Sequence, residues 1–352
     1  MTNKIHVSII IPTYKRAHLL KYVLDGLLNQ NYRDFEVLTV IKPSGDNSEG
    51  VVKKYKKCLN LKLIIQEKGY FTDALNLGLK HARGDVIAFL DDDAIPLPNW
   101  LTEHIKLYAN PNIGGVAGNV IPATLNGREL KPFNENASQI IPNHKSSLEN
   151  VGRKLWSRPL EKLEDYLVYI SKAGIVEYNS NLSKYARYHI TNSLLGMGAN
   201  MSVLSRAVKN FSFPNSWILG LSNEQFLGWH IWRKGYNLVF NPHAKVYHII
   251  HDQTLSRKIK ETKKDVLRIV EYNLLFYQLR NLEKNFSWTH RITWLMFINL
   301  LSLKKICLDK EVKQIAKIKG TFFSEIIGIK WLISRKFSGR YSPLIDLKRI
   351  AG

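Results

Sequence analysis

The sequence of 352 residues is poor in cysteine, in acidic side chains and in long apolar runs. Its two cysteines, Cys58 and Cys307, are too few for a disulfide framework and fit a reducing compartment. The chain has no run of about 18 apolar residues, the length that a membrane-spanning helix requires. Met1–His6 leads directly into a strand-like run without the hydrophobic region of a signal peptide, so we expect a cytoplasmic protein.

Acidic residues are scarce relative to basic ones, 29 against 51, and the formal net charge is +22. Over half of this excess falls in residues 251–352, which hold 21 Lys and Arg against 9 Asp and Glu. Such a charge predicts a polyanionic partner, namely anionic lipid, nucleic acid or a phosphorylated substrate. Nucleic acid is the weakest of these, because the sequence shows no zinc-ligand spacing and no aromatic RNA-binding motif. We therefore expect an anionic membrane surface as a partner and no nucleic acid.

Short apolar runs alternate with helical patterns in the first quarter of the chain. Four runs have the length and composition of buried strands, at residues 7–11, 35–41, 61–65 and 86–90. Three stretches between them have helical character, at residues 17–28, 51–58 and 72–81. Strands that alternate with helices predict an α/β fold, in which a mostly parallel sheet is covered by helices on both faces.

The strand at residues 86–90 ends in three consecutive carboxylates, Asp91, Asp92 and Asp93. Adjacent carboxylates repel one another, and crowding them beside a buried strand is costly unless a cation or hydrogen-bond donors share the site. The carboxyl end of a strand in an open α/β sheet is also where ligands bind. A divalent ion, Mg²⁺ or Mn²⁺, held by carboxylates and substrate phosphates fits this chemistry, and a solvated acidic turn is the alternative.

Other candidate side chains are less specific on their own. Thr13, Tyr14 and Arg16 follow the first strand and precede a helix N-terminus, which favours anions, although an ordinary polar turn has the same composition. Glu224 falls in the first turn of a later helix, where it either interacts with the helix dipole or serves as a general base. His248 follows a strand-like run and is either a ligand of metal or phosphate or a structural histidine.

The second half of the chain is harder to interpret. Residues 122–160 are rich in Pro, Asn, Ser and charge, which predicts loops suited to an active-site lid. Residues 258–280 predict a basic helix. Residues 288–305 predict an apolar helix that contains Trp288 and Trp294 and has basic flanks. That helix is too short to span a membrane, so it either lies in the membrane interface or packs on the main domain.

Together these stretches resemble the inverting glycosyltransferases of family two, which have a GT-A fold. The resemblance rests on five motifs, namely Ile10–Arg16, Gly84–Asp85 with Phe89–Pro96, Gly198–Met201, Asn223–Glu224 followed by Gly235–Tyr236, and Val246–His248. Each motif is weak alone, but the five occur in the family's order and spacing over about residues 5–250. The resemblance implies a GT-A catalytic domain at residues 1–250 and a basic helical extension at residues 251–352.

The resemblance also assigns roles to residues. The nucleotide-sugar would contact Pro12, Thr13, Tyr14, Arg16, Lys42, Asp73, Asp91 and Asp92. The acceptor side would include Gly198, Ala199 and Asn200, and the metal, Mg²⁺ or Mn²⁺, would be held by Asp93 and His248. Glu224 would deprotonate the acceptor hydroxyl, which attacks the anomeric carbon from the face opposite the leaving nucleoside diphosphate.

Substrates and location follow from the same resemblance. A nucleotide-diphospho-sugar would be the donor, with a UDP-sugar favoured, and the acceptor would be lipid-linked or a glycan. The basic C-terminal region would place the protein peripherally on the cytoplasmic face of the membrane.

The sequence departs from the family pattern at two positions. The second strand ends in Ile41–Lys42, where the family usually has an Asp pair that reads the base, and Asp46 or Asp73 is the available substitute. Asn223–Glu224 stands where the family has Glu-Asp, and the longer side chain moves the carboxylate by about an ångström. The alternative function is therefore a nucleotide-binding, glycosyltransferase-like protein without turnover.

Overall fold

The computed structural model describes residues 5–127, 129–134, 138, 155, 158–160, 162–215, 217–250, 261–282, 285–309, 314–337 and 341–352. Of the loops predicted over residues 122–160, the first part instead forms strands as far as Pro132. Most of the remainder of that stretch lies outside the described residues, and so does the suggested lid.

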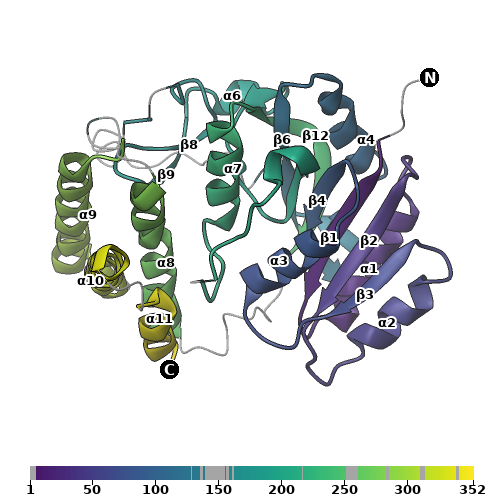
Figure 1. The fold of residues 1–352 in the computed structure, drawn as a ribbon, viewed down its shortest axis with the longest axis horizontal. Coiled ribbons are helices and arrows are strands. Elements are labelled where there is room, and N and C mark those ends of the chain that lie inside the picture. Colours follow the sequence, from purple (N-terminus) through teal and green to yellow (C-terminus); the bar gives the residue numbers. More distant parts are fainter. Residues whose placement is uncertain are drawn as a thin grey trace.

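A ten-stranded sheet forms one end of the molecule (Figure 1). Its strands are β1 (Val7–Thr13), β2 (Phe35–Ile41), β3 (Leu61–Ile65), β4 (Val86–Leu90), β5 (Ala94–Pro96), β6 (Ile113–Asn126), β7 (Glu129–Pro132), β10 (Thr191–Asn192), β11 (Asn200–Leu204) and β12 (Asn237–Ile249). The order is β10-β12-β6-β11-β4-β1-β2-β3, with β5 paired to β12 and β7 to β6. A separate two-stranded sheet contains β8 (Val168–Ile170) and β9 (Val176–Tyr178).

The central strands run mostly in one direction. β3, β2, β1 and β4 are parallel neighbours, and β6 is parallel to β12. Only β11 reverses the direction between them, because it is antiparallel to both β4 and β6. Every residue of β1 and β4 is buried, which explains why both are continuous apolar runs in the sequence. The predicted α/β fold with a mostly parallel sheet is confirmed.

Helices cover the sheet. They are α1 (Ala17–Leu28), α2 (Ser48–Tyr55), α3 (Phe71–His81), α4 (Trp100–Ile105), the short α6 (Ser183–Ala186) and α7 (Asn223–Arg233). The first and third agree with the predicted ranges, but α2 begins three residues before the predicted start. The reason is local, because the Asp46 carboxylate accepts hydrogen bonds from the Ser48 hydroxyl at 2.8 Å and from its backbone N–H at 3.5 Å.

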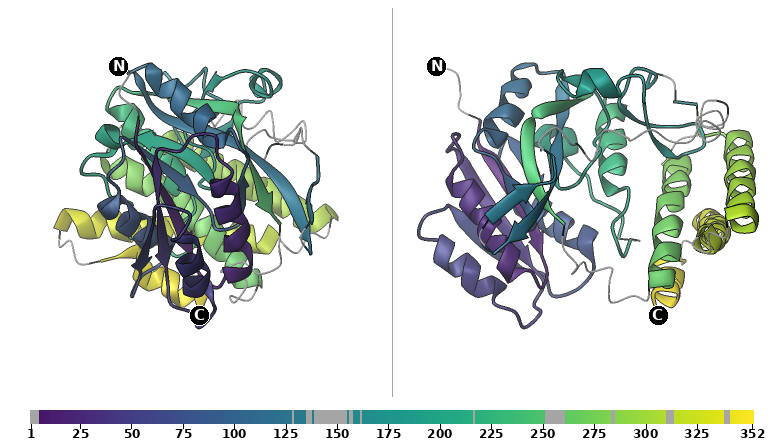
Figure 2. Two further views of the ribbon diagram at one scale, coloured as in Figure 1. Left: turned by 90° about the vertical axis from the view of Figure 1, so that its right-hand side faces the viewer. Right: turned by 180° about the vertical axis from the view of Figure 1, so that it is seen from behind.

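Four C-terminal helices form the opposite end of the molecule, with α7 between them and the sheet (Figures 1 and 2). They are α8 (Glu261–Leu282), α9 (Trp288–Asp309), α10 (Gln314–Phe337) and α11 (Pro343–Ala351). Leu267, Val270 and Leu274 of α8 belong to the same buried hydrophobic cluster as the strands of the sheet. The C-terminal region therefore packs against the main body, and the division of the chain at residue 250 stays a prediction.

The predicted apolar helix at residues 288–305 is part of α9, and one of its faces is buried. Trp294 and Ile298 lie on that face, and Arg291 is fully buried among them. Arg291 donates a 2.6 Å hydrogen bond to Glu325 of α10 and stacks on the ring of Phe276 of α8. Arg291 is thus an internal link between three helices. Within the described residues, none of the helices combines the length and the apolar character needed to cross a membrane.

Candidate active site

A cavity of about 850 Å³ lies where the carboxyl ends of β1, β2 and β4 face α8 and α11. Most of the side chains predicted from the sequence line it. They are Pro12, Thr13, Tyr14, Arg16, Lys42, Asp91, Asp92, Asp93, Gly198, Ala199, Glu224 and His248. The strand-end rule explains this convergence, since parallel strands bring the loops after their carboxyl ends to one edge of the sheet.

Asp73 and Asp46, the proposed substitutes for a base-reading Asp pair, are not among the residues that line the cavity. The Asp73 carboxylate accepts a 2.7 Å hydrogen bond from the backbone N–H of Tyr70 and caps α3. The Asp46 carboxylate accepts a 3.0 Å hydrogen bond from the backbone N–H of Ala17, in addition to its bonds from Ser48. Both acids therefore satisfy donors at the start of helices, a local use that their spacing in the sequence did not reveal.

Asn200 also lies away from the cavity, unlike its neighbours Gly198 and Ala199. Its side chain is fully buried, and its amide group donates to the backbone carbonyls of Asn119 at 2.9 Å and Ala244 at 2.8 Å. Its amide oxygen accepts from the Trp100 indole at 2.7 Å. Asn200 thus links β11 to β6, β12 and α4, which gives its side chain a structural use, and its place on the acceptor side stays a prediction.

The loop after β1 is fastened to the aspartates after β4. Arg16 Nη1 donates to Asp92 Oδ1 and to Asp93 Oδ2, both at 2.6 Å, and the Thr13 hydroxyl donates to Asp92 Oδ2. Burial opposes the charge of Arg16, but Asp92 and Asp93 outweigh it and raise the pKa of the guanidinium above its ordinary value. Both carboxylate oxygens of Asp92 are therefore engaged within the protein, and this residue orients the loop after β1.

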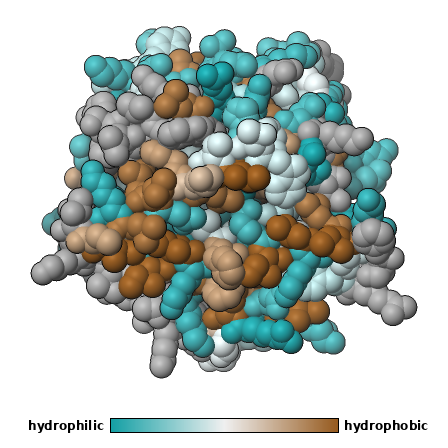
Figure 3. Space-filling model, turned by 90° about the vertical axis from the view of Figure 1, so that its left-hand side faces the viewer, coloured by the Kyte–Doolittle hydropathy of each residue, from teal (hydrophilic) through white to brown (hydrophobic). Residues whose placement is uncertain are grey.

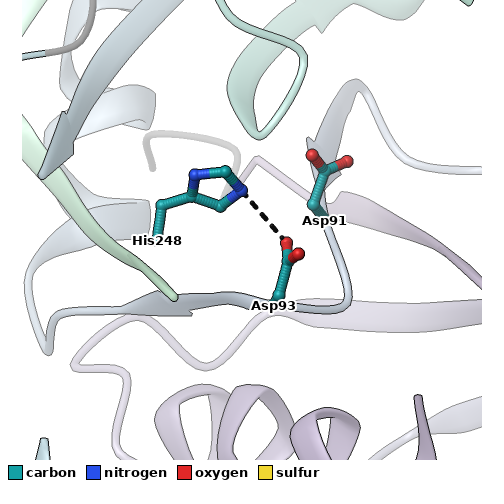
Figure 4. Close-up of side chains that lie close together, drawn as sticks. All are labelled: Asp91, Asp93 and His248. Atoms are coloured by element: carbon teal, nitrogen blue, oxygen red, sulfur yellow. Dashed lines mark ion pairs between the residues drawn. The ribbon is translucent and has the colours of Figure 1, made fainter. Parts of the chain in front are cut away.

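Asp91, Asp93 and His248 form a second group, in which one ligand atom from each lies within 4.8 Å of the others (Figure 4). His248 Nε2 is 3.2 Å from Asp93 Oδ1. Burial tends to lower the pKa of His248, but the hydrogen bond and negative charge of Asp93 raise it overall. Burial also raises the pKa of Asp91 to about 7, and repulsion from Asp93 adds to this effect.

The chemistry of this group fits a divalent cation. Carboxylate oxygens suit Mg²⁺ and Mn²⁺, and an imidazole nitrogen is compatible with Mn²⁺. The carboxylate of Asp91 makes no hydrogen bond within the described part of the chain, although it borders the cavity. A cation at this point would relieve the repulsion that raises the pKa of Asp91. Asp91, Asp93 and His248 are therefore the residues that could hold the metal.

Glu224 reaches the cavity from the first turn of α7. Two residues with left-handed backbone precede it, Gly220 (φ 77°) and Ser222 (φ 63°), and they turn the chain into the helix. A Cβ at Gly220 would lie 2.6 Å from the ring of Phe71, so this position requires glycine for space as well as for conformation. Burial raises the pKa of Glu224 to about 7, and the charge of Asp91 contributes. A carboxylate that titrates near neutral pH is suited to general-base catalysis.

Sequence reasoning missed residues on both sides of the cavity. On the sheet side the missed residue is Tyr70, whose ring lies 5.6 Å from Nζ of the expected Lys42. Lys42 Nζ also donates to the Gly69 carbonyl at 2.7 Å and lies 5.8 Å from the Tyr14 ring. The position of Tyr70 shortly after β3 is the signal that could have revealed it, because the residues that follow β1, β2 and β4 also line the cavity. On the helical side, Arg268, Tyr272 and Lys348 also line the cavity. No motif marked them, because only tertiary packing brings α8 and α11 to this edge.

Comparisons with known proteins agree with this geometry. The model of Glycosyl transferase family 2 matches residues 8–186, just over half of the chain. A chondroitin synthase from Escherichia coli is 39% identical over 106 residues, which cover 29% of this chain and 16% of that protein. The UDP-Glc:alpha-D-GlcNAc-diphosphoundecaprenol beta-1,3-glucosyltransferase of Escherichia coli is 36% identical over 115 residues, which cover 32% of this chain and 45% of that protein. The chain thus spans less than half the length of these two relatives.

Among solved structures, a mannosyltransferase from Pyrobaculum calidifontis in complex with GDP-Man and Mn²⁺ superimposes with a TM-score of 0.51. The two share 16% sequence identity over 99% of this chain and 85% of the other. This likeness shows a common fold and agrees with the GT-A fold expected from the sequence.

Proposed function

The chain belongs to Glycosyl transferase family 2, and from this premise we propose that it is an active inverting glycosyltransferase. It transfers a sugar from a nucleotide-diphospho-sugar to a hydroxyl of a lipid-linked or glycan acceptor. One observation carries the proposal, namely that the Asp91–Asp93–His248 group and the carboxylate of Glu224 line the same cavity. An enzyme of this class needs both parts, one for the leaving diphosphate and one for the attacking hydroxyl.

The reaction proceeds as a single displacement. Glu224 accepts the proton of the acceptor hydroxyl while the hydroxyl oxygen forms a bond to the anomeric carbon of the donor sugar. The bond from the anomeric carbon to the phosphate oxygen breaks, and its electron pair leaves with the nucleoside diphosphate. Because attack and departure occur on opposite faces, the anomeric configuration is inverted. Glu224 carries a raised pKa of about 7, so it is a strong enough base to accept the proton near neutral pH.

The protein supports this step by holding its charged groups in place. Arg16 is fixed by two 2.6 Å ion pairs to Asp92 and Asp93, which in turn hold the loop after β1 against the loop after β4. Asp91, Asp93 and His248 would hold Mg²⁺ or Mn²⁺, which when bound supplies positive charge to the diphosphate leaving group. Tyr14 and Lys42 lie at the ends of β1 and β2, where the nucleoside would contact them.

A UDP-sugar is the favoured donor. The relative from Escherichia coli named above uses UDP-Glc according to its name and matches this chain over 115 residues. The test is thermal stabilisation by UDP, GDP, TDP, CDP and ADP, each with and without Mn²⁺, because a ligand that binds only the native state raises the unfolding midpoint. A shift with UDP that depends on Mn²⁺ is expected. No shift with any nucleotide in a folded sample would contradict the transferase proposal, and a shift with another nucleotide would correct the donor.

A lipid-linked acceptor lies in a membrane, so the proposal also includes binding of the protein to a membrane surface. The faces of α9 and α10 that point away from the protein core are apolar and exposed, and brown residues gather on this face in Figure 3. On α9 and α10 these residues recur at helical spacing, at Ile292, Met296, Leu300 and Leu303 and at Ile315, Phe322, Ile329 and Ile333. Exposed lysines such as Lys304 and Lys319 lie on the same two helices.

An anionic bilayer is the partner that matches both features, because apolar side chains enter the interface while lysines contact the headgroups. The apolar area is contributed by two long helices, which is more than scattered single exposed residues provide. We therefore expect the protein to bind vesicles that contain phosphatidylglycerol more tightly than vesicles of phosphatidylcholine alone.

Cosedimentation with these vesicles tests the surface. The Leu300→Ser/Phe322→Ser double variant should bind about thirtyfold more weakly, because each substitution removes on the order of 1 kcal/mol of apolar burial. The matched control is Tyr188→Ser/Ile190→Ser, which removes two exposed apolar side chains outside α9 and α10. Equal binding of the wild type and the α9–α10 variant would contradict the membrane role. Self-association of the wild type that this variant abolishes, without vesicle binding, would assign the surface to a second copy of the chain.

A further inference from the structure

The helical side of the cavity contains side chains of a different kind from those of the sheet side. Arg268 and Tyr272 of α8 line the cavity, and their spacing of four residues places them on one face of the helix. Lys348 of α11 lines it as well. None of these three was expected from the family resemblance, which ends near residue 250, and all three lie beyond the family match at residues 8–186.

A buried carboxylate fixes α8 to the loop that leads to Glu224. Glu271 is fully buried, and its Oε1 accepts hydrogen bonds from the backbone N–H groups of Ile218 at 2.7 Å and Leu219 at 2.9 Å. Its Oε2 accepts from the N–H of Leu221 at 3.2 Å. These bonds hold Tyr272, the next residue of α8, in a set position relative to Glu224.

Tyr272 presents an aromatic ring beside the general base. The residue borders the cavity and is 49% exposed. Its hydroxyl makes no hydrogen bond within the described residues. Burial raises the pKa of its hydroxyl, the negative charge of Glu224 raises it further and Arg268 opposes this, so the Tyr272 hydroxyl lies within electrostatic range of each of these two side chains. An exposed aromatic face in a pocket suits the apolar C–H face of a sugar ring, whose hydroxyls remain free for other contacts.

Arg268 and Lys348 add positive charge at the same place. Both are exposed, and neither forms an ion pair within the described part of the chain. Of the acidic groups of the cavity, Asp92 and Asp93 are already paired with Arg16, and Glu224 makes no ion pair with Arg268 or Lys348 in the described part of the chain. Two unpaired cations beside an aromatic ring favour a ligand that carries negative charge next to a sugar, and phosphate is the group that Arg and Lys bind most generally.

We propose that Tyr272, Arg268 and Lys348 form the acceptor subsite, and that the acceptor is a sugar attached to phosphate. The sugar ring lies on Tyr272 with a hydroxyl toward Glu224, and the phosphate contacts Arg268 and Lys348. This inference rests on the proposed function, because it assigns the acceptor of that same reaction. The phosphate has two possible sources, a lipid-linked sugar diphosphate or a free sugar phosphate, and the experiment distinguishes them.

The test is calorimetric binding to the full chain saturated with UDP and Mn²⁺, so that the donor side is filled. The probes are N-acetylglucosamine 1-phosphate against N-acetylglucosamine, and farnesyl phosphate against farnesol. The wild type should bind at least one phosphorylated probe at least about tenfold more tightly than its neutral partner, because a hydrogen-bonded charge contributes on the order of 1.5 kcal/mol. Preference for the sugar phosphate alone indicates a soluble acceptor, and tighter binding of farnesyl phosphate indicates a lipid carrier.

Variants assign the effect to these residues. Arg268→Ala/Lys348→Ala should lose the preference for the phosphorylated probe, while Lys53→Ala/Lys57→Ala, which removes two exposed cations near α2, should retain it. Tyr272→Ala should weaken the sugar probes and Tyr272→Phe should not, because the ring remains. Binding of UDP is measured in the same samples. If the wild type does not bind UDP, the result contradicts the proposed function and not the subsite.

Two outcomes would overturn the subsite. One is equal binding of the phosphorylated probes by the wild type and by Arg268→Ala/Lys348→Ala. The other is the absence of any preference for phosphate in the wild type at millimolar probe concentrations while UDP still binds.

Discussion

The two sides of the cavity are built differently. On the sheet side, the polar groups stand at the ends of buried strands and are held by each other, as the Arg16 bonds to Asp92 and Asp93 show. On the helical side, Arg268 and Lys348 are exposed cations on helices, and Tyr272 is half exposed beside them. Side chains that are held in place by one another suit a chemical step that is common to a family. Exposed side chains on packed helices can be replaced by other residue types without disturbing that step.

The family match also differs between the two sides of the cavity. Residues 8–186 include the loop after β1 and the three aspartates after β4, but they end before Glu224, His248 and the C-terminal helices. The family match therefore covers the strand ends on the sheet side of the cavity and none of the three side chains on its helical side. If the comparison is correct, substitutions on the two sides should have different effects on donor binding and on turnover.

Glu224→Gln should give the largest effect on turnover. Glu224 is the proposed base of the step in which groups from both sides of the cavity take part. The amide cannot accept the proton, so turnover should fall by about 10³-fold, within the range for loss of a general base. Binding of UDP with Mn²⁺ should stay unchanged, because Glu224 is outside the Asp91–Asp93–His248 group. Initial rates of donor consumption measure the effect. Unchanged rates would show that Glu224 is not the base, and an inactive wild type that binds UDP would favour the alternative without turnover.

Asp93→Asn should break the sheet side. Asp93 is shared by Arg16 and His248, so one substitution weakens an ion pair and removes a charge from the proposed metal group. Turnover should fall by about 10²-fold, and the Mn²⁺-dependent stabilisation by UDP should disappear. Asp85→Asn, a substitution at the opposite end of β4, serves as the matched control. Wild-type stabilisation by UDP and Mn²⁺ in a folded Asp93→Asn sample is the result that would remove the metal role.

Glu271→Ala should separate the helical side from the loop before α7. Three backbone N–H groups lose their acceptor, and at about 1 kcal/mol each the free energy of unfolding should fall by about 3 kcal/mol. Chemical denaturation measures this, with the exposed Glu67→Ala as the control. Glu271→Gln retains one acceptor oxygen and should lose less. An unfolding free energy unchanged in Glu271→Ala would mean that the two sides are not joined at this point.

The smallest expected effect is the dependence of turnover on pH. The pKa of Glu224 is raised to about 7, so the carboxylate is protonated and inactive below this pH and available above it. Turnover should therefore fall about tenfold per pH unit below 7 and level off above it, when measured with saturating Mn²⁺ so that protonation of Asp91 does not limit the rate. The residual turnover of Glu224→Gln should lack this dependence. A wild-type profile that is flat between pH 5 and 7 would contradict the assignment of the base.

The fold of the sheet side could be predicted from local patterns. The runs at residues 7–11 and 86–90 are β1 and β4, because strands that are buried on both faces are continuously apolar. The aspartates after β4 were identified because carboxylates at a strand end are costly without a cation or donors, and the structure supplies both donors and a candidate metal group.

Residues with a local structural use were harder to interpret. Asp73 and Asp46 cap the starts of α3 and α2, and Asn200 joins three elements inside the core. The same side chains can bind a ligand or a backbone group, and a sequence does not show which partner is nearer. The start of α2, set by a hydrogen bond to Asp46, was misplaced for the same reason.

The sequence by itself determined the parallel sheet, the positions of its strand ends and most of the residues on the sheet side of the cavity. These features depend on periodicity and on short-range spacing, which the order of residues specifies directly. Only the tertiary structure decided which face of α9 is buried, that Arg291 is internal, and that Arg268, Tyr272 and Lys348 line the same cavity as Glu224. Those outcomes depend on contacts between helices and strands far apart in the chain, and such contacts leave no periodic mark in the sequence.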